Sequence, residues 1–333
     1  MTMPQPPHAP AQPAAEPGDR SASPPTDRVI AVLDLLSAHP GREFTLTEII
    51  RHSGISKATC HAVVRRLADA HYLLHTPTGY SLGPALIAVG HAAERSFPAA
   101  RAAQHHLVSL AEEFGVPCTA AVHDSKTITV VDAAGPRSPG DTSGVGLRIP
   151  LVPPYGAVQI AWSGEEEIRA WLDRAPRADD DFRHRLIGVL ETIRRRGYDV
   201  HRESTASMRL REALYGLMRE DLSASQQEAV ALLYTELSHI DSLPERLDDR
   251  ARYNVNTISA PAFDADGRTS VVLSLLMAKP LRGAEISRAG KHLLAAATDI
   301  TRSTGGRPAE RDNEPRYTHG PKQRPRRGIE DTP

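Results

Sequence analysis

The apolar positions near the start of the chain recur at the three- and four-residue spacing of amphipathic helices. The first stripe predicts a helix that Thr26 or Asp27 caps and that ends near residues 39–41, where proline and glycine follow. We expect this helix to pack inward through Val29, Val32, Leu33 and Leu36.

A second, shorter helix is predicted by TLTEIIRHSG, residues 45–54. Thr45 and Glu48 have the spacing of a capping box, in which each side chain satisfies a backbone N–H of the other residue. Gly54 suits the left-handed turn that ends such a helix. We expect its buried face to consist of Leu46, Ile49 and Ile50.

A third helix is predicted to begin after Ser56, a good N-cap, and its residues divide into two faces. The face expected to be buried consists of Cys60, Val63, Val64 and Leu67. The opposite face is small near its start and basic further along: Lys57, Ala58, His61, Ala62 and Arg65. Small residues allow a backbone to approach base edges, and His and Arg can donate hydrogen bonds to them. Arg66 lies on the flank, where it is better placed for a phosphate.

Two short helices joined by a glycine turn define a helix-turn-helix, whose second helix normally enters the major groove. The run YLLHTPTGYSLGP, residues 72–84, adds two short strand patterns around a turn, and this hairpin would form a wing. The sequence therefore predicts a winged helix that binds DNA. Winged helices also serve as protein-interaction modules, so a sensory or interaction module is the alternative at this point.

Beyond residue 84, helix and strand patterns follow one another in mixed order, which favours an α+β sheet with helices packed on it. A linker helix is expected first, then a helix over residues 99–115, and the last helix spans residues 284–302. Strand patterns occur at 117–124, 126–134, 253–264 and 268–278.

Composition and charge exclude several classes of protein. The net charge is −1, so the chain is not a globally basic nucleic-acid binder, although a local basic surface remains open. No apolar run is long enough to span a bilayer and no signal core is present, so we expect a cytoplasmic protein without membrane contact. Cys60 and Cys118 form neither a disulfide framework nor a zinc site.

No arrangement of residues indicates an enzyme. The chain lacks G-x-S-x-G, and the glycines at residues 135–146 lack the Lys-Ser/Thr ending of a phosphate loop. We interpret that segment as a mobile loop near a pocket. His105 and His106 would point about 100° apart on a helix, which suits surface histidines better than a metal pair. We expect no catalytic residue, no metal and no cofactor.

Both ends of the chain are expected to be unfolded. Residues 1–25 contain eight prolines and few large apolar side chains, so they cannot bury enough surface to offset their ordering entropy. Residues 304–333 are similar and include the basic cluster PKQRPRRG at 321–328. We interpret this cluster as part of a solvated tail, and a non-specific phosphate contact is the alternative.

The segment from RVIAVLDLL to LIAVG, residues 28–90, resembles the IclR-type bacterial transcriptional regulators. Its most specific part is GYSLGP followed by LIAVG. Two later segments agree with the same family: IRRRGYDVHRE at 193–203 and VNTISAPAFDADGRTSVVLSLL at 255–276. The similarity covers roughly residues 26–203 and 250–303.

The resemblance implies a GAF-like C-terminal domain that binds a small-molecule effector. It also implies homodimers or dimers of dimers on palindromic operators. Three strand residues align with pocket positions of the family, and the PPYG turn aligns with its helix-start site, where a helix N-terminus could hold a carboxylate. The candidate effector residues are Tyr155, Gly156, Ala157, His201, Thr257 and Ser274.

Two departures from the family pattern bear on the effector. The run IPLVPPYGAVQIAW, residues 149–162, lacks the lysine that usually follows the glycine, and roughly forty extra residues fall within about 204–250. Leu276 also stands where the family has another pocket serine. We therefore expect a more apolar pocket and a larger effector, such as an aromatic or amphipathic acid.

The sequence thus predicts an α+β chain that is a ligand-controlled DNA-binding regulator. DNA contacts are expected from Thr45, Ser56, Lys57, Ala58, Thr59, His61, Arg65, Arg66 and Tyr80. The expected parts are a tail (1–25), a winged helix-turn-helix (26–83), a linker helix (84–98), a GAF-like effector and oligomerisation domain (99–303) and a second tail (304–333).

Overall fold

The computed structural model describes residues 24–39, 41–136, 144–175, 180–202 and 247–309. They form two compact units that divide between residues 86 and 87, within helix α4 (Ala85–Ser96). Most of the glycine-containing loop, most of the insert and the basic cluster at 321–328 lie outside the described residues.

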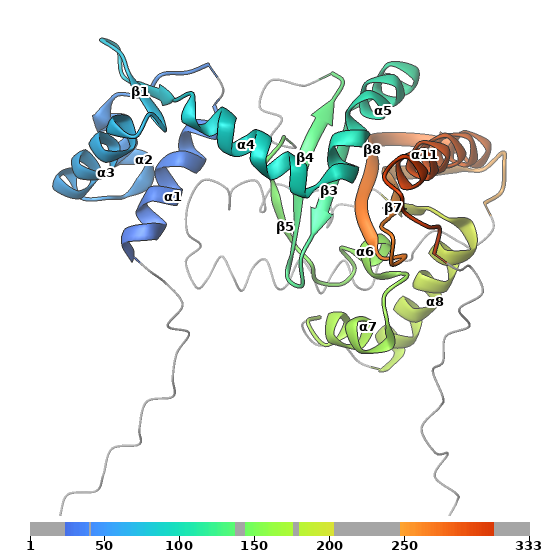
Figure 1. Cartoon of the computed structure of the whole chain (residues 1–333). Helices are drawn as coiled ribbons and strands as arrows, with labels where there is room; N and C mark the ends of the chain where they lie inside the picture. Colours follow the sequence, from blue (N-terminus) through green and yellow to red (C-terminus); the bar gives the residue numbers. More distant parts are fainter. Residues whose placement is uncertain (1–23, 40, 137–143, 176–179, 203–246, 310–333) are drawn as a thin grey trace, which may run out of the picture. The chain divides into compact units, whose positions relative to one another are not determined.

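The first unit is a winged helix-turn-helix, drawn in blue to cyan in Figure 1. Its two strands pair antiparallel, with Leu74 opposite Ser81. This confirms the predicted order of three helices and a hairpin. Its elements are α1 (Pro24–Ser37), α2 (Leu46–Ser53), α3 (Lys57–Asp69), β1 (Leu73–His75) and β2 (Tyr80–Leu82).

The start of α1 differs from the prediction. The helix begins at Pro24, so the expected cap at Thr26 or Asp27 is wrong. Proline fits the first turn because its missing N–H has no intrahelical partner there and its fixed φ is already helical. The helix thus takes in the last two residues of the stretch that was expected to be unfolded.

The core of the first unit contains the predicted inward residues of all three helices except Val29, which is only half-buried and lies outside the cluster. Val32, Ile49 and Cys60 are each fully buried, and burial raises the pKa of the Cys60 thiol. Phe44, which the helical patterns did not single out, is also fully buried. It exchanges two backbone hydrogen bonds with Tyr80, at 2.9 Å and 2.8 Å, so the segment before α2 is joined to the wing.

The second unit is built on a six-stranded sheet in which every neighbouring pair is antiparallel. The strand order is β5-β4-β3-β8-β7-β6. The strands are β3 (Cys118–His123), β4 (Thr127–Ala134), β5 (Arg148–Pro150), β6 (Asp199–Arg202), β7 (Arg252–Phe263) and β8 (Thr269–Arg282).

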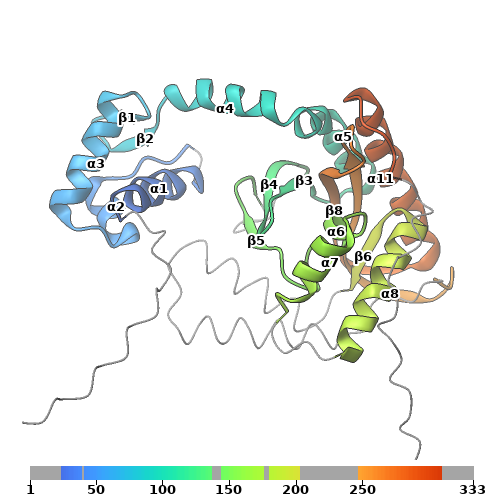
Figure 2. The same cartoon turned by 60° about the horizontal axis from the view of Figure 1, so that its bottom comes forward.

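Helices cover both faces of this sheet, as Figure 2 shows. One hydrophobic cluster joins the sheet to α5 (Pro98–Phe114) and α11 (Gly283–Ser303). The second joins the other face to α6 (Ala157–Ile160), α7 (Glu165–Leu172) and α8 (Asp180–Arg196). The arrangement confirms the predicted α+β class.

The hairpin of β7 and β8 has the predicted turn, in which the Asp264 carboxylate accepts the backbone N–H groups of Asp266 and Arg268. The chain after α11 differs from the expected tail. The Arg307 N–H donates to the Asp264 carbonyl, and Gly306 lies so close to the Phe263 carbonyl oxygen that a Cβ would meet it at 2.0 Å. These backbone contacts hold the chain against the hairpin up to residue 309, beyond the expected start of the tail at 304.

Within the described ranges, no helix is long and apolar enough to cross a membrane. The same ranges contain no cluster of three or more His, Cys, Asp or Glu side chains that could hold a metal ion. The rings of His105 and His106 lie 3.8 Å apart between centroids on α5, without a third ligand.

Candidate DNA-binding and effector sites

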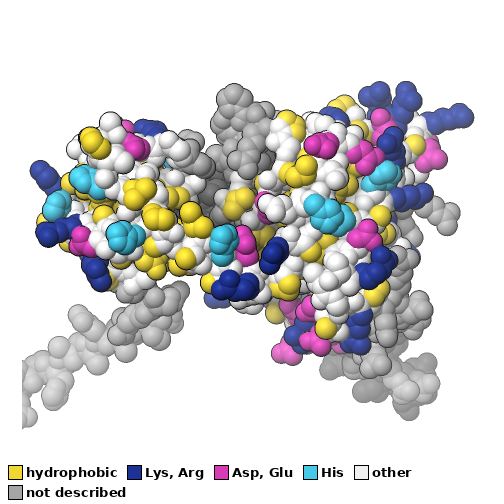
Figure 3. All heavy atoms as spheres, turned by 45° about the horizontal axis from the view of Figure 1, so that its top comes forward, with side chains coloured by type: hydrophobic (Ala, Val, Ile, Leu, Met, Phe, Trp, Pro, Cys, Tyr) yellow, Lys and Arg dark blue, Asp and Glu magenta, His cyan; other side chains and the backbone are white. Residues whose placement is uncertain are grey.

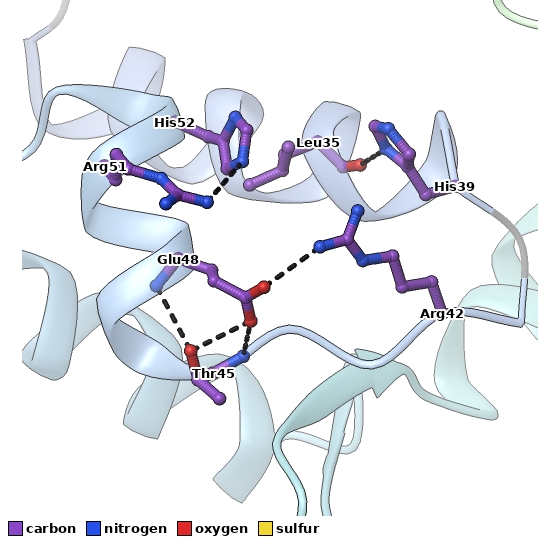
Figure 4. Close-up of polar contacts among 7 residues, drawn as sticks. All are labelled: Leu35, His39, Arg42, Thr45, Glu48, Arg51 and His52. Atoms are coloured by element: carbon purple, nitrogen blue, oxygen red, sulfur yellow. Dashed lines mark hydrogen bonds and ion pairs between the residues drawn. The ribbon is translucent and has the colours of Figure 1, made fainter. Parts of the chain in front are cut away.

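The entrance to α2 is fixed by the predicted capping box (Figure 4). The Glu48 backbone N–H donates to the Thr45 hydroxyl at 3.2 Å, and the Thr45 N–H donates to the Glu48 carboxylate at 2.9 Å. Arg42 adds an ion pair to Glu48 at 2.9 Å. These hydrogen bonds, the backbone N–H of Thr45 first, hold the pKa of Glu48 below its usual value. The Thr45 hydroxyl is therefore engaged in fixing α2.

The turn between α2 and α3 also follows the prediction. Gly54 adopts the left-handed conformation with φ of 64°, and its N–H donates to the Ile50 carbonyl at 3.0 Å. The Ser56 side chain then caps α3 by accepting the Thr59 N–H, and the two hydroxyls lie 2.9 Å apart. Ser56 and Thr59 thus define where α3 starts and how it leaves the turn.

The outward face of α3 has the composition that the helical projection predicted. Lys57, Ala58, His61 and Arg65 are exposed, while Cys60 and Val64 are buried. Within the described part of the chain, the side chains of Lys57, His61 and Arg65 form no hydrogen bond or ion pair. Arg66 is exposed on the flank. The polar groups of this face are therefore available to a ligand outside the chain.

The wing presents few charged groups. Tyr80 is half-buried, and its ring stacks on His75 with 4.5 Å between centroids. The tip is closed by Thr76, whose hydroxyl donates to the Gly79 carbonyl at 3.2 Å, and Thr78 hydrogen-bonds to Glu43. Tyr80 thus supports the hairpin through both its backbone and its ring.

The predicted strand residues of the effector site share one face of the second sheet. His201 lies directly opposite Thr257 in neighbouring strands, and Ser274 lies opposite Ser259. Directly opposite residues point to the same face. The Ser259 and Ser274 hydroxyls lie 2.8 Å apart. The alternating residues point the other way into the cluster of α5 and α11, among them Val200, Ile258 and Leu275.

A buried carboxylate lies on this face in the edge strand β6, where the sequence analysis had placed none. Asp199 is 6% exposed, and its Oδ2 lies 3.2 Å from Nε2 of His201. Its other oxygen accepts the Val200 N–H at 2.7 Å. Burial works against the charged forms of both groups, yet their attraction holds the pKa of Asp199 below and that of His201 above the usual values.

The three candidates of the PPYG turn have different surroundings. The Tyr155 ring lies parallel to that of His201, with 6.0 Å between centroids and 9° between planes, and the Trp171 indole donates to the Tyr155 carbonyl at 3.0 Å. Gly156 is packed against Leu151, and Ala157 is buried in the cluster of α6 to α8. Tyr155 therefore lies beside His201, whereas the side chain of Ala157 belongs to the core.

The helix that follows this turn is short. Helix α6 has four residues, so it aligns few peptide dipoles and the proposed carboxylate contact at its N-terminus is not supported. All four side chains are buried, and α6 packs against β7 and β8. One of them, Gln159, carries a buried Oε1 that has no hydrogen-bond partner within the described residues. A buried amide oxygen of this kind is suited to a polar ligand group.

A hollow lies along α11, which covers the other face of the sheet. Its volume is about 400 Å³, and it contains none of the predicted effector residues. Its lining residues are Asp249, Ala284, Ser287, Arg288, Lys291 and His292.

Residues 25–77 match the family model described as the IclR helix-turn-helix domain. The first unit is an IclR helix-turn-helix domain. The chain is also 23% identical over 284 residues to the HTH-type transcriptional regulator XynR of Escherichia coli strain K12, covering 84% of this chain and 96% of that protein. These matches confirm the resemblance to IclR-type transcriptional regulators that the sequence showed.

Solved structures of IclR-type proteins share the fold over most of the chain. The regulator from Alicyclobacillus acidocaldarius has a TM-score of 0.55 at 22% identity, covering 86% of this chain and all of that one. An IclR homologue from Microbacterium hydrocarbonoxydans, solved with 4-hydroxybenzoate, has a TM-score of 0.52 at 15% identity, covering 84% and 99%. These likenesses give no support to the alternative in which the winged helix contacts protein.

The second unit also contains site residues that the sequence analysis missed. Asp199 and Ser259 belong to the polar face, but each stands in a strand whose polar and apolar residues simply alternate, so nothing singled them out. Asp199 is two positions from His201, a spacing that puts both side chains on one face of a strand. That period-two relation was the signal that could have identified it.

Proposed function

We propose that this IclR-type regulator binds a specific DNA sequence through the exposed face of α3 and through the wing. The observation that supports this proposal is the placement of Lys57, His61 and Arg65 on the outward face of the second helix of a matched helix-turn-helix domain. Basic side chains near base edges supply direct readout, and Arg66 on the flank suits a phosphate. Thr45, Ser56 and Thr59 act mainly by fixing the two helices, and Tyr80 by supporting the wing.

The second unit, in this proposal, binds a small organic acid on the polar face of its sheet. His201, Tyr155 and Gln159 provide an imidazole whose pKa is raised, an aromatic surface and a buried amide at that face. Thr257 and Ser274 add hydroxyls. The relative solved with 4-hydroxybenzoate supports an aromatic acid as the class of ligand, and Leu276 in place of a serine favours a larger acid over a very small one.

A homo-oligomer on a palindromic operator completes the proposal. Helix α4 has no buried residue, and two of its apolar side chains are exposed: Ile87 at 63% and Val89 at 49%. A helix of 12 residues is marginal by itself in water, so a partner surface is needed to stabilise it. Figure 3 shows hydrophobic side chains gathered over the first unit, with Lys and Arg side chains along the edge where α3 lies in Figure 1. A second copy of this chain would provide the partner surface for α4 and would pair two recognition helices.

Effector binding would then change the relative pose of the two DNA-binding domains, which is a coupling free energy between sites and not a chemical step. We accordingly propose a cytoplasmic regulator without enzymatic activity. Its domain limits are those expected from the sequence, except that the first unit begins at Pro24 and the chain after Ser303 packs on the hairpin of β7 and β8.

A genome-wide binding profile of the tagged protein tests the proposed function. Discrete sites that share an inverted repeat are expected, and the addition of the effector should change their occupancy. Calorimetry with two- and three-carbon acids against aromatic acids tests the ligand class. A profile without discrete sites would contradict the proposed DNA binding. Binding only of the two- and three-carbon acids would contradict the proposed ligand class.

A further inference from the structure

The strand β6 places two ionisable side chains on the polar face of the second sheet. Asp199 and His201 are two residues apart, and their nearest atoms are separated by 3.2 Å. Their cross-strand partners are Ser259 and Thr257. Arg196, at the end of α8, is the further charged group that acts on Asp199 among the described residues.

The surroundings of the two side chains differ. The Asp199 side chain is 9% exposed, whereas that of His201 is 31% exposed and lies beside Tyr155. A buried carboxylate is costly unless it is paired and hydrogen-bonded. The Val200 N–H and His201 provide those partners. The more accessible member of the pair is therefore the histidine, which can meet a ligand while Asp199 stays behind it.

The ring geometry leaves a second donor for that ligand. Nε2 of His201 faces the Asp199 carboxylate, and Nδ1 lies on the other edge of the same ring. In the imidazolium form both nitrogens carry a proton. One edge then donates to Asp199 and the other can donate to an anion. The parallel Tyr155 ring restricts the tilt of the imidazole and offers a flat surface for an aromatic group.

We propose that Asp199 is a positioning residue of the effector site, which holds His201 as an imidazolium and orients it to receive the carboxylate of an organic acid. This inference rests on the proposed effector function of the same face. It assigns a role to a residue that does not itself contact the effector.

The pKa of each group supports this arrangement. Burial by itself would lower the pKa of His201, but the charge and the hydrogen bond of Asp199 raise it. His201 therefore keeps its proton to a higher pH than an ordinary histidine and loses it as the pH rises through the raised pKa. Without the Asp199 charge only burial remains, so the proton would be lost at lower pH.

Titration of His201 in the ligand-free full-length protein is the first test. Nitrogen-15 NMR of histidine-labelled protein follows the ring, and the signal is assigned by its loss in His201→Gln. We expect His201 to lose its proton at a higher pH in the wild type than in Asp199→Asn. The same titration in both proteins, or a proton lost at higher pH in Asp199→Asn, would overturn the proposal.

Ligand binding provides the second test, with 4-hydroxybenzoate as the probe and its uncharged amide as the control ligand. At about pH 8, Asp199→Asn should bind the acid about tenfold more weakly or worse, because one pKa unit corresponds to a tenfold change. At about pH 5.5 the loss should vanish, since His201 regains its proton and the neighbouring negative charge is gone. The affinity for the amide should not change at either pH. A loss that is equal at both pH values, or equal for acid and amide, would instead show a purely structural role.

A matched control separates this effect from charge removal in general. Asp299→Asn makes the same change on the exposed face of α11, where the aspartate side chain is 55% exposed, and should leave both readouts unaltered. If no acid binds the wild-type protein, the ligand class in the proposed function fails. The NMR titration still decides whether Asp199 sets the charge of His201.

Discussion

Gly290 of α11 lies against the ring of Tyr198, so closely that a Cβ built on the glycine would come within 2.4 Å of the ring carbon Cε2. Tyr198 is buried in the cluster of α5 and α11. Asp199, the next residue, points to the other face of the sheet. The absence of a side chain at Gly290 therefore lets Tyr198 pack, and Tyr198 fixes the start of the strand that carries Asp199 and His201.

Gly290→Ala is expected to destabilise the protein by about 1–3 kcal/mol, because the added methyl group overpacks a site where the nearest atoms belong to a rigid ring. Gly188→Ala is the matched control. Gly188 is also helical, in α8, and a Cβ there meets nothing within 4 Å. Gly188→Ala should stabilise the protein by up to about 1 kcal/mol. Denaturant unfolding measures both, and equal effects would refute the packing argument.

The hydroxyl of Thr45 is expected to matter for stability through the capping box. Thr45→Val keeps the shape of the side chain but removes the acceptor for the Glu48 N–H, so the first unit should lose about 1 kcal/mol. Thr45→Ser retains the acceptor and should remain within a few tenths of a kcal/mol of the wild type. Equal thermal stability of the two variants would contradict this role of the hydroxyl.

The carboxylate of Glu48 makes part of this stability dependent on pH. Its pKa is lowered in the folded protein, first by the Thr45 backbone N–H. The stabilisation is therefore present above the unfolded pKa and is lost as the pH falls through the folded one. Wild type should be more stable than Glu48→Gln at neutral pH, and the difference should vanish in acid. A stability difference between the wild type and Glu48→Gln that stays constant between neutral and acidic pH would contradict this role of the carboxylate.

Short-range sequence patterns predicted most of the helices and turns of the first unit. The Thr45–Glu48 box, the Gly54 turn and the two faces of α3 each follow from short-range spacing, and all are present in the structure. The start of α1 was misplaced because Thr26 or Asp27 was expected to cap the helix and Pro24 and Pro25 were assigned to an unfolded tail, although the first turn of a helix tolerates proline. Phe44 was missed because it belongs to no periodic pattern and is buried only by the pairing of two distant segments.

The second unit depended more on contacts between distant residues. The turn at Asp264 was predicted from its own sequence, and the α+β class from the order of patterns. The Asp199–His201 pair was not predicted, because a charged residue on a strand normally indicates a solvated face. Likewise, the residues after Ser303 looked unfolded by composition, whereas their backbone is hydrogen-bonded to a hairpin some forty positions earlier, as the Arg307–Asp264 bond shows.

The apolar surface of α4 leads to a prediction about assembly. Ile87→Glu places a charge on the exposed helix and should raise the dissociation constant of the homo-oligomer about tenfold or more. Ala92→Glu adds the same charge at an exposed alanine of the same helix and should have a smaller effect. Sedimentation over a range of concentrations measures both, and oligomers of equal stability would exclude Ile87 from the contact.

The central claim is that the exposed face of α3 reads DNA, and the affinity of Arg65→Ala for a DNA site recovered from the genome-wide profile tests it most directly. Arg169→Ala is the control, since that arginine forms an exposed pair with Glu165 in the second unit. Arg65→Ala should weaken binding to the recovered site by about 1–3 kcal/mol and relax the preference for one base pair, while the control binds as the wild type does. An unchanged affinity and an unchanged footprint for Arg65→Ala would contradict the account.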